Sequence, residues 1–356
     1  MIFKKSGAII ALFFALSLPA PRSASADAAS DSFDVALMAY ARQDYTQSVR
    51  LLTPLAKKNY APAQAQLAYM YEFGIGVRKN AGEATKLYKK LMSAYIAKAM
   101  AGDAEAQYQV GQLHYGGKGV PENVPEAMLW YLKAAELGHL ISQYKLALLL
   151  DTGEKAPRDP KAAIDWYTRA AEQGHTNSQM FLAIKFYRGR DTVQDYGLAA
   201  KWFQKAAENG NAYSQSILGF MYASGQGVKE DKQEALAWYR KGAEQGDKDS
   251  QYDLGMKLLK GDGVPRSLSE AAHWFGQSAA QGQMAAQFEL ARLYAKGDGV
   301  RRDPVLAYAW YNVAIMSGHY PAGKPRDALV KTMNADEIAE AEQLSSMWKF
   351  GQLIRR

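Results

Sequence analysis

The sequence predicts an all-α solenoid built from helix-turn-helix repeats. Tryptophans, glutamines and glycines each recur with the same spacing of 36 residues. A fixed period of about 20–50 residues is the sequence signature of repeat architectures. The recurring residues are Trp130, Trp166, Trp202, Trp238, Trp274 and Trp310, then Gln107, Gln143, Gln179, Gln215, Gln251 and Gln287, and then Gly138, Gly174, Gly210, Gly246, Gly282 and Gly318.

Residues 1–26, which precede the repeats, have the pattern of a secretory signal peptide. Lys4 and Lys5 give the positive start, residues 7–18 form an uncharged and largely apolar run, and Ala24 and Ala26 supply the small residues of a cleavage site. The run is too short to span a bilayer. We therefore expect cleavage near Ala26, no transmembrane anchor, and a mature protein that is periplasmic or secreted from a Gram-negative bacterium.

Composition narrows the function classes further. The chain has no cysteine, which excludes disulfides, thiolate metal sites, a cysteine nucleophile and a lipidated cysteine, and fits export to a periplasm. The formal net charge is +7, but Lys4, Lys5 and Arg22 lie in the expected signal. No lysine and arginine cluster stands out in the remainder, so we expect no nucleic-acid partner.

The first helix of each repeat, called helix A here, contains the repeated glutamine. Three places later comes an apolar residue and four places later only alanine or glycine, which lets a neighbouring helix come close. Ten places after the glutamine a glycine is expected to end the helix in the left-handed conformation. These glycines are Gly74, Gly117, Gly153, Gly189, Gly225, Gly261 and Gly297. In repeats three and four the usual G-x-G-V is missing, so these two turns should differ.

The second helix, helix B, has a clear start signal. The N-cap position holds asparagine, aspartate or serine in every copy, and four copies add a glutamate three places later, the partner of a capping box. An alanine four places after the cap and the tryptophan three further on share one helical face, which must pack against the next repeat. The expected N-caps are Asn80, Asn123, Asp159, Asp195, Asp231, Ser267 and Asp303.

The first copy departs from the pattern. It begins at Gln64 and has Leu87 in place of the tryptophan, and the distance to Gln107 is seven residues longer than the period. Seven residues are about two turns at about 3.6 residues per turn. We therefore expect an insertion within residues 91–100 that lengthens a helix without rotating its buried face.

The combined pattern, Q-x-x-L-G-x-x-Y-x-x-G-x-G-V-x-x-D-x-x-x-A-x-x-W-Y-x-K-A-A-E-x-G, resembles the Sel1-like repeat, a relative of the tetratricopeptide repeat. The resemblance implies a right-handed α-solenoid with helical caps at both ends. The expected organisation is a signal peptide at 1–26, a tetratricopeptide-like hairpin at 27–62, seven repeats over 63–322 (63–105, 106–141, 142–177, 178–213, 214–249, 250–285 and 286–322), and capping helices at 323–356.

The sequence offers little material for catalysis. His139, His175 and His319 follow the repeated glycine and are assigned to inter-repeat turns, while His114 and His273 have no evident catalytic partner. Signature motifs of hydrolases, metalloproteases and nucleotide-binding loops are absent. Some cysteine-rich relatives are linked with penicillin binding and hydrolysis, but this chain lacks their cysteines. We expect no catalytic residue, no metal and no cofactor.

A binding surface is the better prediction. In tetratricopeptide-like solenoids helix A lines the concave wall, and the variable positions one, two, five and eight after the glutamine are apolar in the middle repeats. Exposed apolar patches mark interaction sites, although positions one and five could instead partly pack against neighbouring helices. The candidate partner-binding residues are Tyr108, Tyr115, Tyr144, Phe181, Ile184, Tyr187, Ile217, Phe220 and Met256.

The function expected from these features is a non-catalytic scaffold that binds a protein partner through its concave face. The resemblance implies roles in envelope assembly, signalling regulation or host interaction, without choosing among them or naming the partner. The alternative is a cell-wall or exopolysaccharide glycan ligand, for which Tyr108, Tyr115, Tyr144 and Tyr187 would provide stacking platforms. Hydrolysis of peptidoglycan or β-lactams is the third and least expected activity.

Overall fold

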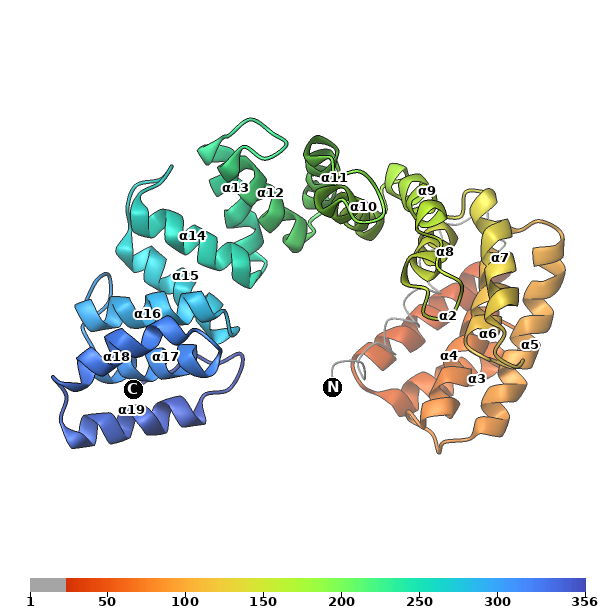
Figure 1. Cartoon of the computed structure of the whole chain (residues 1–356). Helices are drawn as coiled ribbons and strands as arrows, with labels where there is room; N and C mark the ends of the chain where they lie inside the picture. Colours follow the sequence, from red (N-terminus) through yellow and green to blue (C-terminus); the bar gives the residue numbers. More distant parts are fainter. Residues whose placement is uncertain (1–23) are drawn as a thin grey trace. The chain divides into compact units, whose positions relative to one another are not determined.

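The computed structural model describes residues 24–356 and is helical throughout that range, with no β-strand (Figure 1). The expected signal peptide lies outside the described residues except for its last three. The helices are α2 (Ala24–Ala41), α3 (Tyr45–Lys57), α4 (Ala61–Phe73), α5 (Ala81–Met100), α6 (Ala104–Tyr115), α7 (Val124–Glu136), α8 (Leu140–Thr152), α9 (Pro160–Glu172), α10 (Thr176–Arg188), α11 (Tyr196–Glu208), α12 (Ala212–Ser224), α13 (Lys232–Glu244), α14 (Lys248–Lys260), α15 (Leu268–Ala280), α16 (Met284–Lys296), α17 (Pro304–Met316), the 3₁₀ helix η1 (Tyr320–Ala322), α18 (Gly323–Val330) and α19 (Ala335–Met347).

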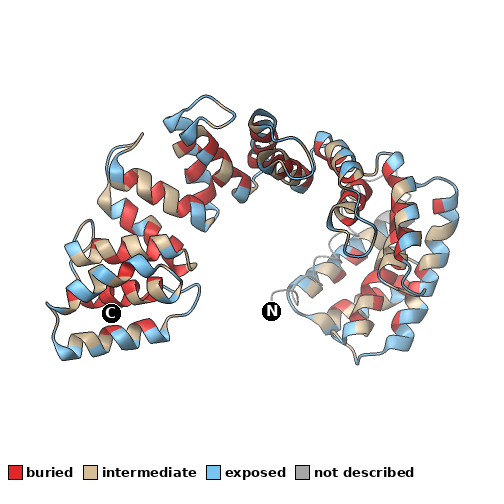
Figure 2. Ribbon diagram, viewed as in Figure 1, coloured by how far each residue is buried: buried red, intermediate tan, exposed pale blue. Residues whose placement is uncertain are grey.

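The chain divides into two compact units, with the boundary after Arg169, inside α9. Successive helices pack against each other from α2 to α8 in the first unit and from α10 to α17 in the second, and α17 also packs against η1, α18 and α19. The even-numbered helices from α4 to α16 are the A helices, and the odd-numbered ones from α5 to α17 are the B helices. Buried residues follow the sides where paired helices meet (Figure 2). The predicted all-α solenoid of helix pairs is therefore confirmed.

Local signals set the helix ends largely as predicted. Six A helices end at a glycine in the left-handed conformation, and Asn80, Asn123 and most other predicted caps accept a hydrogen bond from the third residue of helix B. Ser267 is the N-cap of α15, as predicted, but its side chain makes no such bond. The capping boxes were also wrong: among the described helices only α19 has both reciprocal bonds, and Glu126 instead accepts from the indole of Trp130 at 2.9 Å.

The repeated glutamine joins each repeat to the one before it. Its side-chain Nε2 donates to the backbone carbonyl eight residues earlier, at the end of the preceding B helix, at 3.0–3.2 Å in all seven copies. Buried polar groups need such partners. The accepting residues are Ala56, Ala99, Ala135, Ala171, Ala207, Ala243 and Ala279.

The aromatic ring at the centre of each repeat belongs to the residue that follows the tryptophan position. Tyr131 and Tyr239 are almost completely buried, and a methyl group added at Gly111 or Gly219 of the paired A helix would come within 2.7–2.8 Å of those rings. Trp130, Trp202 and Trp238 keep only 7–8% of their surface exposed, and Trp310 is fully buried. A cationic side chain three residues later covers four of the tryptophans, as Lys241 covers Trp238 at 3.9 Å. The alanine and tryptophan face expected to pack is therefore buried in these repeats, and the residue after the tryptophan adds a second packed ring.

The two irregular regions behave differently. α5 has 20 residues, whereas the other B helices have 13, which confirms the lengthened helix in the first copy. In repeat four, Asp191 adopts the left-handed φ of +69° that a second glycine adopts in most other copies. Its carboxylate is 3.3 Å from the buried Lys185 ammonium, and this ion pair holds a turn that lacks the glycine.

Candidate interaction surface

One side of helix A remains uncovered in the second unit. The positions two before and two, five and nine after the repeated glutamine are spaced i, i+4, i+7 and i+11, which places them on one helical face. We call this face the A stripe. In α12 it consists of Tyr213, Ile217, Phe220 and Ser224. Tyr213 and Phe220 are 38% and 45% exposed. Because large apolar side chains are usually buried, this exposure distinguishes the stripe from the core.

The preceding A helix of the same unit extends the apolar region. In α10 the A stripe places Phe181 and Ile184 between Asn177 and Arg188, and both apolar side chains are half-buried. The apolar part of the surface therefore covers two successive repeats of the second unit.

In the next two A helices, α14 and α16, charged residues occupy positions of the A stripe. The A stripe of α14 carries Asp249, Asp253, Met256 and Lys260, with the Asp253 side chain half-buried. Burial, together with the negative charges of Asp249 and Asp247, raises the pKa of Asp253 to about 7, although Lys257 opposes the shift.

The nearby cations have other partners. The ammonium of Lys257 is 2.6 Å from Asp262, whose second oxygen lies 2.9 Å from Lys232. On α16, Glu289 and Arg292 pair with each other at 2.8 Å. Within residues 24–356 the Asp253 carboxylate makes no hydrogen bond or ion pair of its own.

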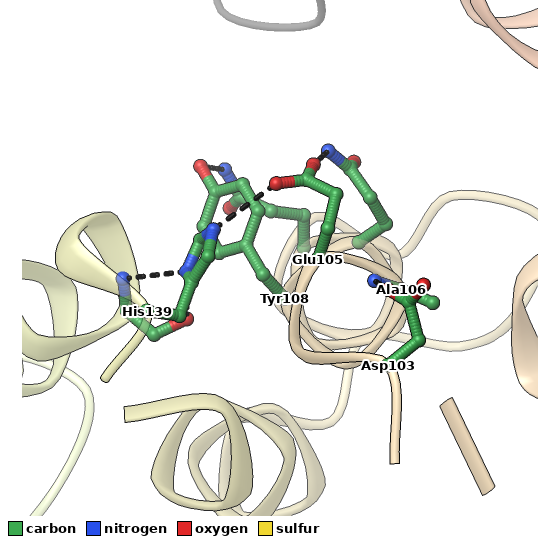
Figure 3. A network of polar contacts seen from close by, with 8 residues as sticks. Asp103, Glu105, Ala106, Tyr108 and His139 are labelled. Carbon is green, nitrogen blue, oxygen red and sulfur yellow. Dashed lines mark hydrogen bonds and ion pairs between the residues drawn. The ribbon is translucent and has the colours of Figure 1, made fainter. Parts of the chain in front are cut away.

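In the first unit the corresponding face of α6 is closed by a polar network (Figure 3). Nδ1 of His139 accepts from the N–H of Ser142, so Nε2 carries the proton and donates to Glu105 at 3.0 Å. Gln109 donates to the other oxygen of Glu105 at 2.5 Å. Burial would raise the pKa of Glu105, but the hydrogen bonds from His139 and Gln109 outweigh it and hold that pKa below its ordinary value.

The network also involves position five of the A stripe. Gln112 donates to the hydroxyl of Tyr108 at 2.5 Å and accepts from the hydroxyl of Tyr131 at 2.7 Å. His139 and His175 are thus the N-cap residues of α8 and α10, a more specific role than the turn position expected for them.

The candidate tyrosines do not all lie on an open surface. Tyr108 is only 5% exposed and its ring packs against Tyr131 and His139, so it is corrected from a surface residue to a core residue. Tyr115 lies under the ammonium of Lys155, at 4.9 Å, and Tyr144 lies 6.4 Å from the ring of Tyr167.

Tyr187 is also engaged inside the fold. Its hydroxyl donates to Gln226 at 3.0 Å, and its ring meets the rings of Tyr196 and Phe203 edge-on. These tyrosines come from positions one and eight after the glutamine, which turn toward helix B. The packing alternative expected this at position one but not at position eight, and at position five Phe220 is exposed instead.

The remaining five candidates share the A stripe, which the structure extends by one aromatic residue. Phe181, Ile184, Ile217, Phe220 and Met256 come from positions two and five. Tyr213 was missed because helix A was predicted to open at the glutamine, whereas α12 starts three residues earlier, at Ala212. The signal available in the sequence was an aromatic residue one helical turn before Ile217.

Stacked helix pairs, joined here by the repeated glutamine, define the class of α-solenoids. More specifically, the chain belongs to the Sel1 repeat family. The family model described as Sel1 repeat matches residues 61–91, 104–139, 140–175, 176–211, 212–247, 248–283 and 285–319, more than half of the chain. Sel1 repeat solenoids are commonly protein-interaction scaffolds and are generally non-catalytic.

Two solved structures support this assignment. A protective antigen present in uropathogenic Escherichia coli strains, with an SLR fold, is 32% identical with a TM-score of 0.67; the match covers 86% of this chain and 65% of that one. This chain therefore spans about two thirds of that antigen's length. A Sel1 repeat protein from Oxalobacter formigenes is 29% identical with a TM-score of 0.61, covering 91% of this chain and 93% of that one. No curated protein matches the chain.

The described part of the chain also bears on metal binding and membrane insertion. Among residues 24–356 no three His, Cys, Asp or Glu side chains gather where they could hold a metal ion. None of the helices described combines the length and the apolar character needed to cross a bilayer.

Proposed function

We propose that this protein is a non-catalytic scaffold that binds a protein partner through the A stripe of its second unit. The single observation behind the proposal is the exposure of Phe220 and Tyr213 on α12, next to Phe181 and Ile184 on α10. Aromatic side chains are preferred anchors of protein interfaces because they bury a large area with few rotatable bonds. In solenoids of this type helix A forms the concave wall.

The proposed place of action is the periplasm or the exterior of a Gram-negative cell. This part of the proposal rests on the charge, apolar run and small residues of segment 1–26. Envelope assembly, signalling regulation and host interaction remain the roles that such a scaffold would serve there. Fractionation of the producing cells, with sequencing of the mature N-terminus, tests it: cytoplasmic protein that still begins at Met1 would contradict export.

Protein binding is preferred to glycan binding because of the tyrosines. Glycan recognition depends on flat, open rings, and one of the four proposed platforms, Tyr108, is a core residue. Apart from Tyr213, the apolar side chains on the A stripe of α10 and α12 are Phe and Ile, which have no polar group with which to recognise sugar hydroxyls.

The test is affinity capture with the full chain, comparing wild type with a Phe181→Asp, Phe220→Asp double variant. We expect a protein captured by the wild type, and identified by mass spectrometry, to be lost with the double variant. A matched control replaces Leu129, an exposed residue of helix α7 in the first unit, by aspartate, and should retain the partner. Partners unaffected by the double variant, together with lost retention on peptidoglycan or exopolysaccharide, would favour the glycan alternative.

A further inference from the structure

The second unit places the partly buried, unpaired carboxylate of Asp253 beside its apolar surface. Phe220 is 45% exposed on α12, and Asp253 lies on the same stripe of the next A helix, α14. The two helices contact each other directly. A ligand bound on Phe220 therefore reaches Asp253 without leaving the surface.

The electrostatics around Asp253 favour a cation. A partly buried carboxylate is stabilised by an opposite charge, but the neighbouring Asp249 and Asp247 are negative. Of the positive groups, Lys257 is held by Asp262, and Arg292 on α16 is held by Glu289. Burial and the two aspartates raise the pKa of Asp253 to about 7, which is the response expected of a carboxylate that lacks a counter-charge.

We propose that the second unit recognises a peptide segment in which one or two large apolar side chains are followed or preceded by a lysine or arginine, with the apolar anchors on Phe220 and Ile217 and the cation on Asp253. The inference deepens the proposed scaffold function and rests on it. It commits to a cationic, apolar protein segment, because a neutral or acidic segment would leave Asp253 unpaired beside two further aspartates.

The geometry sets the spacing within that segment. Packed neighbouring helices lie about 10 Å apart, and an extended peptide advances about 3.3 Å per residue. About three residues should therefore separate the apolar anchor from the cation. An acidic residue at the same place would meet like charges and be rejected.

The probes are fluorescein-labelled synthetic peptides with the core Phe-Ser-Phe-Ser-Ser-X, where X is lysine, norleucine or glutamate, and the same cores in reverse order. Binding to the full chain is followed by fluorescence anisotropy. We expect the lysine peptide of at least one order to bind about tenfold more tightly than its norleucine analogue, because a charge-assisted pair replaces an apolar contact, and the glutamate peptide to bind most weakly.

Three variants assign the effect to its residues. Asp253→Asn should abolish the preference for lysine over norleucine and leave norleucine binding unchanged. Asp253→Glu should restore part of the preference. Glu244→Gln, which removes an exposed acid from α13, is the matched control and should preserve it. Circular dichroism establishes that each variant is folded.

The outcomes separate this inference from the proposed function. Equal binding of the lysine and norleucine peptides, no binding by any peptide, or a lysine preference that survives Asp253→Asn, would overturn the cationic segment. The scaffold function is tested separately, by the Phe181→Asp, Phe220→Asp double variant. If that variant still captures the protein, the scaffold function is contradicted. Phe220→Asp should in addition weaken every peptide that binds.

Discussion

The A helices of the two units share one backbone design and present different surfaces. In the first unit, hydrogen bonds of Glu105 with Gln109 and His139, and of Gln112 with two tyrosine hydroxyls, close the stripe of α6. In the second unit the matching positions of α12 are apolar and open, and α14 carries the unpaired carboxylate of Asp253 on its stripe. The repeat therefore fixes the packing of the helix pairs, while the A stripe carries different side chains in the two units.

The largest effect should be common to both units. Replacing Tyr131 in the first or Tyr239 in the second by alanine removes the ring that packs against Gly111 or Gly219. Each change should lower the free energy of unfolding by about 3–5 kcal/mol. Urea denaturation followed by circular dichroism measures it. A loss in one unit only would mean that the two units do not share a packing design.

The sequence predicted that common design well. The period, the glycine helix stops and the lengthened α5 follow from residue types that geometry requires at fixed places, such as Gly225 in the left-handed conformation. The role of Gln215 was not predicted, because a buried glutamine shows its partner, the carbonyl of Ala207, only when the helices are packed.

The candidate site was predicted less well, for a geometric reason. Adjacent positions on a helix differ by about 100°, so positions one and two after the glutamine face different sides. Tyr108 at position one is therefore buried, whereas Ile217 at position two lies on the stripe. A repeat pattern alone reveals which positions vary and leaves open which of them face solvent.

The two carboxylates should give the units opposite pH responses. Because the pKa of Asp253 is raised in the folded state, its contribution to stability is fully present below about pH 4 and is lost as pH rises through about 7. Each pKa unit corresponds to about 1.4 kcal/mol, and partial exposure reduces the effect. Asp253→Asn should therefore stabilise the protein by about 2 kcal/mol at pH 8 and by nearly nothing at pH 4.

Glu105 supplies the opposite sign. Its pKa is lowered in the folded state, so its contribution is present above about pH 4 and is lost as pH falls through the folded value. Glu105→Gln should destabilise the protein at pH 7 by a few tenths of a kcal/mol, since the side chain is partly exposed, and not at pH 3. Urea midpoints measured across pH for both variants give the comparison; parallel curves would contradict it.

Position five of the A stripe allows the most direct contrast between stability and binding. Gln112→Ala leaves the buried hydroxyl of Tyr131 without its acceptor and should cost about 1–3 kcal/mol of stability, with partner binding retained. Phe220→Ala removes an exposed ring, so it should change the free energy of unfolding by less than about 1 kcal/mol. It should, however, weaken the binding of the captured partner. Thermal unfolding and affinity capture of the same two preparations provide both measurements.

A small effect that should be the same in both units concerns the tryptophans. Lys133 lies 4.2 Å from the ring centre of Trp130 in the first unit, and Lys241 lies 3.9 Å from that of Trp238 in the second. Replacing either lysine by methionine keeps the apolar stem but removes the charge from the ring face. The expected cost is about 0.5–1 kcal/mol in each unit, as for exposed cation–π pairs. Tryptophan fluorescence during urea unfolding resolves a change of this size, and Lys201→Met, on the exposed surface of α11, serves as the control. An equal, small loss at the two positions, with none in the control, would show that the outer surface is common to both units and that their difference is confined to the A stripe.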